Sequence, residues 1–112
     1  MRDLTHEILA YEKMLTPRVA AEFATLVQKW RQETQHWSSV KRSVLHPAYQ
    51  RIIGMGPTVL PLLLKELRDR PDHWFSALAS IAGEDPAAGT NTFNEALAAW
   101  IEWGKRNRLL SD

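Results

Sequence analysis

The stretch IGMGPTVLPLLLKELRDRPDHWFSALASIAG, from Ile53 to Gly83, decides how this chain folds. Its first half places aliphatic residues at three- and four-residue spacing, which predicts a helix with one buried face. Pro71 cannot continue that helix, and a second stripe runs to Gly83, a typical left-handed cap. The stretch therefore predicts two amphipathic helices joined by a tight turn. Their apolar residues are Val59, Leu60, Leu63, Leu64 and Leu67, then Trp74, Phe75, Leu78 and Ile81.

The sequence before this hairpin also contains helix signals. Asp3 as an N-cap predicts a short helix over residues 3–15, with Leu4, Ile8, Tyr11 and Leu15 on one face. A second and stronger helix is predicted from Thr16 and Pro17 to about residue 35. Residues 36–46 fit either a brief extended piece or a loose helix, and a short helix follows from residue 47.

After the hairpin, the sequence predicts a loop and one last helix. Thr92 and Glu95 match a capping box, and Lys105 and Arg106 suit the negative end of the helix dipole. No pair of strands is predicted. The expected fold is all-α, a compact stack of helical hairpins with five to six helices in a single domain over residues 1–112, divided into an N-terminal helix pair (1–35) and a helical part (47–108).

Composition narrows the class of protein. A chain of 112 residues with 45% hydrophobic residues is long enough for one core. The net charge of +1 favours neither nucleic acid nor membrane as a general partner. The absence of cysteine excludes disulfides and thiolate chemistry. No signal-peptide pattern or membrane-length apolar run is present, so we expect a soluble cytoplasmic protein.

The hairpin resembles a HEAT-type helical repeat over roughly residues 47–104. The first helix of such a repeat carries Gly, an aliphatic residue, Pro and Leu, the turn carries Asp, and the second helix carries an Ala-Leu pair and Ile. The matching residues are Gly56, Val59, Pro61, Leu63, Asp69, Ala77, Leu78 and Ile81. The basic residue common early in the second helix is absent. The resemblance implies a protein that binds other molecules and does not catalyse a reaction.

The whole chain also resembles a family of small bacterial proteins. The pattern is W-x-x-E-T, then S-S, H-P-A-Y and P-D-H-W-F. Its residues here are Trp30, Glu33, Thr34, Ser38, Ser39, His46, Pro47, Ala48, Tyr49 and Pro71 to Phe75. This second resemblance implies no activity.

The residues that carry chemistry do not form a known catalytic or metal-binding motif. The histidines lack a metal-ligand spacing such as H-E-x-x-H, and Ser38 and Ser39 lack a nucleophile elbow. A histidine beside proline or tryptophan is more simply a helix cap or a half-buried packing residue. We therefore expect no enzyme, no metal and no cofactor. An enzyme that uses His46 or His73 stays open, as a hypothesis behind the two that follow.

Aromatic and basic residues carry the main functional hypothesis. Trp30, Trp74 and Trp100 lie on apolar stripes and are predicted to be core, whereas Trp103 is either half exposed or packed against the N-terminal helix. Exposed aromatic residues near arginine are typical of protein-binding hot spots. The predicted contact residues are Trp37, Lys41, Arg42, Tyr49, Trp103 and Arg106.

These residues predict a small adaptor or regulatory subunit of a larger bacterial complex. Its partner would be another protein, encoded nearby, and an antitoxin-like inhibitor would fit the small size. The alternative is a nucleic-acid-binding accessory protein. Residues 36–51 contain Lys41, Arg42 and Arg51 and no acidic residue, a pattern that can contact phosphates and stack on bases.

Overall fold

A computed structural model describes residues 4–111, and their side chains from Pro17 onward. No strand occurs among these residues, which confirms the all-α prediction. Six α-helices and one 3-10 helix are present in the described part of the chain: α1 (Leu4–Thr34), α2 (Val40–Ser43), α3 (Pro47–Gly54), η1 (Gly56–Val59), α4 (Leu60–Asp69), α5 (Phe75–Ala82) and α6 (Phe93–Arg106).

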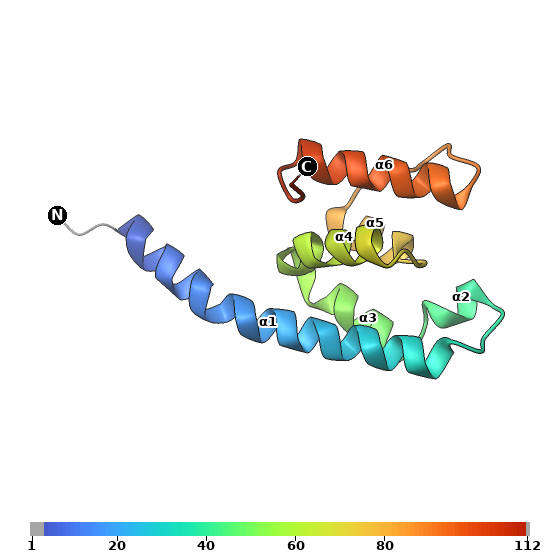
Figure 1. Ribbon diagram of the computed structural model, residues 1–112, viewed down its shortest axis with the longest axis horizontal. Coiled ribbons are helices and arrows are strands. Elements are labelled where there is room, and N and C mark those ends of the chain that lie inside the picture. The colour runs from blue at the N-terminus through green and yellow to red at the C-terminus, as the bar shows by residue number, and fades with distance from the viewer. Residues whose placement is uncertain (1–3, 112) are drawn as a thin grey trace.

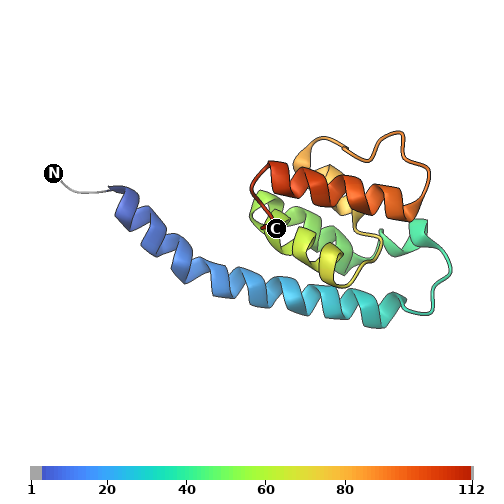
Figure 2. The ribbon, with the colours of Figure 1, turned by 45° about the horizontal axis from the view of Figure 1, so that its top comes forward.

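The N-terminal region is one helix of 31 residues, so the predicted break between two helices is wrong. Pro17 lies inside α1. A proline there removes one backbone hydrogen bond and bends a helix that neighbouring turns can still continue. Figures 1 and 2 show α1 bending in its blue N-terminal part, which extends past the other helices. The predicted N-cap, Asp3, lies outside the described residues.

The helices form three layers (Figure 1). α1 packs on α3, which packs on α5, while α4 lies beside α5 and carries α6 on its other side. One core joins the layers, and it confirms the prediction for Trp30, Trp74 and Trp100. Its largest buried side chains come from α1, α3, η1, α4, α5 and α6 and from the turn before α5: Phe23, Val27, Trp30, Tyr49, Ile52, Val59, Leu60, Leu63, Leu64, Leu67, Trp74, Leu78, Trp100 and Trp103.

The central hairpin follows the sequence closely, with one difference at its start. All five aliphatic residues of the first stripe are buried, and Gly83 caps α5 with a φ of 73°. Residues Gly56–Val59, however, form a 3-10 turn, and the α-helix begins only at Leu60. Pro61 has no N–H to donate to the carbonyl of Pro57, so an α-helical turn cannot form there with its full set of hydrogen bonds.

The last helix confirms its predicted cap and lies close to α4. The Thr92 hydroxyl accepts from the Glu95 N–H at 3.1 Å, and the Glu95 carboxylate accepts from the Asn91 N–H at 3.1 Å. A Cβ at Gly104 would lie 3.0 Å from a methyl carbon of Leu64. Glycine at this position therefore allows α6 to approach α4 closely.

Candidate functional site

The segment that carries α2 is attached firmly to the core on its inner side. Ser39 caps α2 by accepting from the Arg42 N–H at 3.1 Å. The buried Trp30 indole N–H donates to the Ser43 carbonyl at 2.8 Å, and the Gln50 side-chain amide donates to the Val44 carbonyl at 2.8 Å. These contacts hold a helix of only four residues, which could not be stable alone.

His46 ends this segment and starts α3. Its Nδ1 accepts from the Ala48 N–H at 3.0 Å, which leaves the proton on Nε2, where it is donated to the Glu33 carboxylate at 2.8 Å. The side chain is 6% exposed. The interpretation of His46 as a helix cap is confirmed, and its link to Glu33 joins the end of α1 to the start of α3.

Residues on the outer side of the segment form a surface that we call the α2 face: Trp37, Val40, Lys41, Arg42 and Leu45. Val40 is 43% exposed and Leu45 is 68% exposed, and they are the exposed large hydrophobic residues of the described chain. The Arg42 guanidinium carbon lies 4.5 Å from the centre of the half-buried Trp37 ring, within the range of a cation–π contact. An aromatic and a basic group thus meet on a segment that also exposes two aliphatic side chains.

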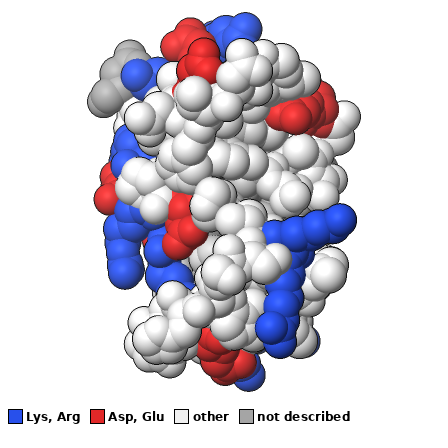
Figure 3. Space-filling view, turned by 90° about the vertical axis from the view of Figure 1, so that its right-hand side faces the viewer, with Lys and Arg blue, Asp and Glu red and all other residues white. Residues whose placement is uncertain are grey.

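The charge of the α2 face is positive and unbalanced. Among the described residues, Lys41 and Arg42 have no carboxylate partner. The acidic residues nearby are already engaged, Glu33 by His46 and Asp72 by Arg31. Figure 3, which views this end of the molecule, shows a mostly uncharged area with basic side chains on both sides and acidic side chains at its upper, left and lower edges.

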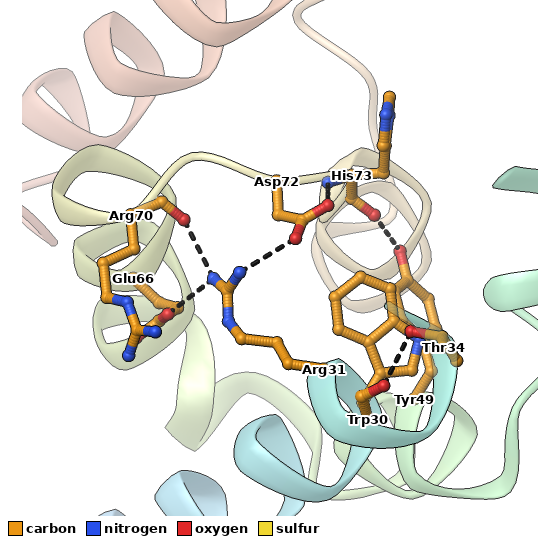
Figure 4. Close-up of polar contacts among 8 residues, drawn as sticks. All are labelled: Trp30, Arg31, Thr34, Tyr49, Glu66, Arg70, Asp72 and His73. Atoms are coloured by element: carbon orange, nitrogen blue, oxygen red, sulfur yellow. Dashed lines mark hydrogen bonds and ion pairs between the residues drawn. The ribbon is translucent and has the colours of Figure 1, made fainter. Parts of the chain in front are cut away.

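A cleft of about 580 Å³ borders the α2 face. Its wall on one side is the loop around Trp37 and Ser38, and on the other side the α4–α5 turn with Arg70, Asp72 and His73. Arg31 also lines the cleft, and its guanidinium binds Asp72 and Glu66 at 2.8 Å each and the Arg70 carbonyl at 2.9 Å (Figure 4).

Arg31 thereby joins α1 to the turn between α4 and α5, a role that sequence analysis missed. Its partners Glu66 and Asp72 lie 35 and 41 residues away in the chain. No local pattern connects residues so far apart. Val40 and Leu45 were also missed, because residues 36–46 have no periodicity that separates an inner from an outer side.

Tyr49 is not a surface contact, and this part of the prediction is wrong. It is 0% exposed, and its ring stacks on Trp74 with centroids 5.3 Å apart. The hydroxyl donates to the His73 carbonyl at 2.9 Å and accepts from the Ala77 N–H at 3.0 Å. Burial raises the pKa of Tyr49 to about 12. Tyr49 therefore belongs to the core, where it aligns α3 with the start of α5.

Trp103 is also buried, which corrects its assignment as an exposed contact. It is 7% exposed, its indole N–H donates to the Glu84 carboxylate at 3.0 Å, and its ring meets the edge of Trp100. Arg106 is exposed but lies at the C-terminal end of α6, away from α2 (Figure 1). Of the six predicted contact residues, the structure brings together Trp37, Lys41 and Arg42.

The described residues contain no cluster of three potential metal ligands. None of the described helices combines the length and the apolar character that a membrane crossing requires. Comparison of the chain with family models, with curated proteins and with solved structures found no match to any of them. The HEAT-type resemblance and the resemblance to small bacterial proteins therefore stay predictions.

Proposed function

We propose that this protein is a non-catalytic interaction module, a small adaptor or regulatory subunit, that binds a protein partner through the α2 face. The observation that carries the proposal is the exposure of Val40 and Leu45 on a segment fixed to the core. Exposure of aliphatic side chains to water is unfavourable, and a protein partner that covers them lowers the free energy. Arg42 and Trp37 add residue types that are enriched at binding hot spots.

A protein partner is favoured over nucleic acid by the kind of groups on the α2 face. Aliphatic side chains such as Leu45 do not stack on bases, whereas they pack well against apolar groups of a protein. The basic segment is also divided: Arg51 faces α1, where its guanidinium lies 3.6 Å from the Glu22 carboxylate. Two remaining cations are few compared with the phosphate contacts of typical nucleic-acid binders.

The test is a pull-down from the native host with tagged protein, with and without nuclease. The variant Val40→Asp/Leu45→Asp places charges on the α2 face. Ala88→Asp/Ala98→Asp is the matched control, because both alanines are exposed on other elements. We expect a nuclease-resistant partner that is retained by the control and lost from the α2-face variant, with unchanged thermal unfolding of both variants.

Two outcomes would contradict the proposal. A partner that is captured equally by both variants would place the binding surface elsewhere. Recovery of nucleic acid alone, lost with Lys41→Glu/Arg42→Glu and weakened steeply by salt, would favour the accessory nucleic-acid-binding role.

A further inference from the structure

The N-terminal part of α1 extends beyond the rest of the molecule (Figures 1 and 2). The buried side chains of α1 that the structure describes all lie in its C-terminal half, from Phe23 to Thr34. A helical segment of about 13 residues is marginal in water without tertiary contacts. Residues 4–16 therefore need a surface that would stabilise them as a helix.

The sequence of this segment indicates the chemistry of that surface. Leu4, Ile8, Tyr11 and Leu15 are spaced by four, three and four residues, which defines one apolar stripe on a helix. Successive helical residues turn by about 100°, so Glu7 and Glu12 fall on opposite edges of the stripe, each about 70° from its centre. Residues 4–15 also contain one cation, Lys13, which falls about 170° from the centre of the stripe, on the opposite side of the helix. The segment is thus an amphipathic helix with acidic residues along both edges of its apolar stripe.

The α2 face has the complementary pattern. Its apolar residues Val40 and Leu45 are exposed, and the neighbouring Lys41 and Arg42 have no carboxylate partner among the described residues. A helix with acidic residues along the edges of an apolar stripe offers both missing groups, carboxylates for the cations and apolar area for the aliphatic side chains.

The segment cannot reach the α2 face of its own chain. α1 is continuous from Leu4 to Thr34, and α2 follows its C-terminal end. Thr16 and Thr34 are 18 positions apart, which keeps the segment about 27 Å from that end, at 1.5 Å per helical residue. Contact between the two surfaces therefore requires two molecules.

We propose that the α2 face binds residues 4–15 of a second copy of this chain. The inference rests on the proposed function, because it uses the same face and names its occupant. The apolar stripe covers Val40 and Leu45, while Glu7 and Glu12 meet Lys41 and Arg42. Two copies can make this contact reciprocally, each giving its N-terminal segment and its α2 face, which closes a two-fold dimer.

The test is charge exchange, measured by sedimentation equilibrium of the full chain over a range of concentrations. We expect the wild-type protein to self-associate, and Lys41→Glu/Arg42→Glu to weaken the association at least about tenfold, since each reversal turns an attraction into a repulsion. Glu7→Lys/Glu12→Lys is expected to have the same effect. An equimolar mixture of the two variants restores association, because both contacts of the mixed pair are again between opposite charges.

Lys29→Glu/Lys65→Glu is the matched control, since both lysines are exposed outside the α2 face, and it is expected to associate like the wild type. A wild-type protein that is monomeric at all concentrations would overturn the inference, as would variants that associate unchanged or a mixture that fails to recover. If the wild-type protein is a monomer and Val40→Asp/Leu45→Asp still loses the host partner, the proposed function stands and this inference fails. If the variants change neither self-association nor capture of the host partner, both are refuted.

Discussion

The aromatic core and the α2 face adjoin the same end of α1, but the side chains of the core have packing and hydrogen-bond partners within the chain, whereas several on the α2 face do not. In the core, Trp30 lies 4.5 Å from Trp74 and 5.5 Å from Tyr49, and Trp30 and Tyr49 bind backbone groups. On the α2 face, Leu45 is exposed and Lys41 has no carboxylate partner among the described residues. The first region contributes to stability, and the second is free to contribute to binding.

The largest effect is expected from Trp74→Ala. Trp74 is 0% exposed and packs against both Trp30 and Tyr49, which also contact each other. Removing a buried tryptophan leaves a large cavity, which lowers the free energy of unfolding by about 3–5 kcal/mol. Chemical denaturation measures this change. The buried Trp74 Nε1 has no hydrogen-bond partner, so Trp74→Phe loses no hydrogen bond and costs less than the alanine variant. An equal decrease in the free energy of unfolding for Trp74→Ala and Trp74→Phe would contradict a packing role.

Alkaline pH is expected to destabilise the core through Tyr49. Its pKa of about 12 in the folded protein exceeds the value of 10.0 that applies when the chain is unfolded. The unfolded state therefore releases its proton first, and stability that is complete below pH 10 is lost as pH rises toward 12. The free energy of unfolding falls by about 1.4 kcal/mol per pH unit in this window.

The control for this titration is Tyr49→Phe, with both proteins in a Tyr11→Phe background so that one tyrosine titrates. Tyr49→Phe is less stable at neutral pH by about 1–3 kcal/mol, because the His73 carbonyl and the Ala77 N–H lose their partner. In Tyr49→Phe, the additional fall in the free energy of unfolding between pH 10 and 12 disappears. A parallel fall of stability in both proteins between pH 10 and 12 would show that Tyr49 is not its source.

The contrast between the two regions also shows what sequence could predict. Local signals sufficed for the hairpin stripes, the Gly83 cap and the Thr92 capping box, because each depends on residues within a few positions. They were insufficient at Pro17, where the helix continues past a residue that usually begins one. Tyr49 and Trp103 were misjudged because burial depends on neighbours distant in sequence, Trp74 for the first and Glu84 for the second.

The candidate site was predictable only in part. Trp37, Lys41 and Arg42 are close in sequence, so a basic and aromatic segment could be recognised there. Leu45 is exposed beside two residues whose backbone carbonyls are held from the core side, Ser43 by Trp30 and Val44 by Gln50, and these partners lie outside the segment. The arginine that lines the neighbouring cleft depends on three elements meeting, which no single segment encodes.

The smallest effect on folding is expected from Leu45→Ser. An exposed residue outside any packed contact changes the free energy of unfolding by no more than about 0.5 kcal/mol, and Leu45 is 68% exposed. At low protein concentration the variant should therefore unfold like the wild type. At high concentration the wild type gains stability from association, since binding to the folded state alone raises apparent stability, and the variant gains less. Thermal unfolding at two concentrations separates these contributions. A loss that is the same at both concentrations would mean that Leu45 supports the fold itself, and the distinction between a core that stabilises and a face that binds would then fail at the residue that defines it most clearly.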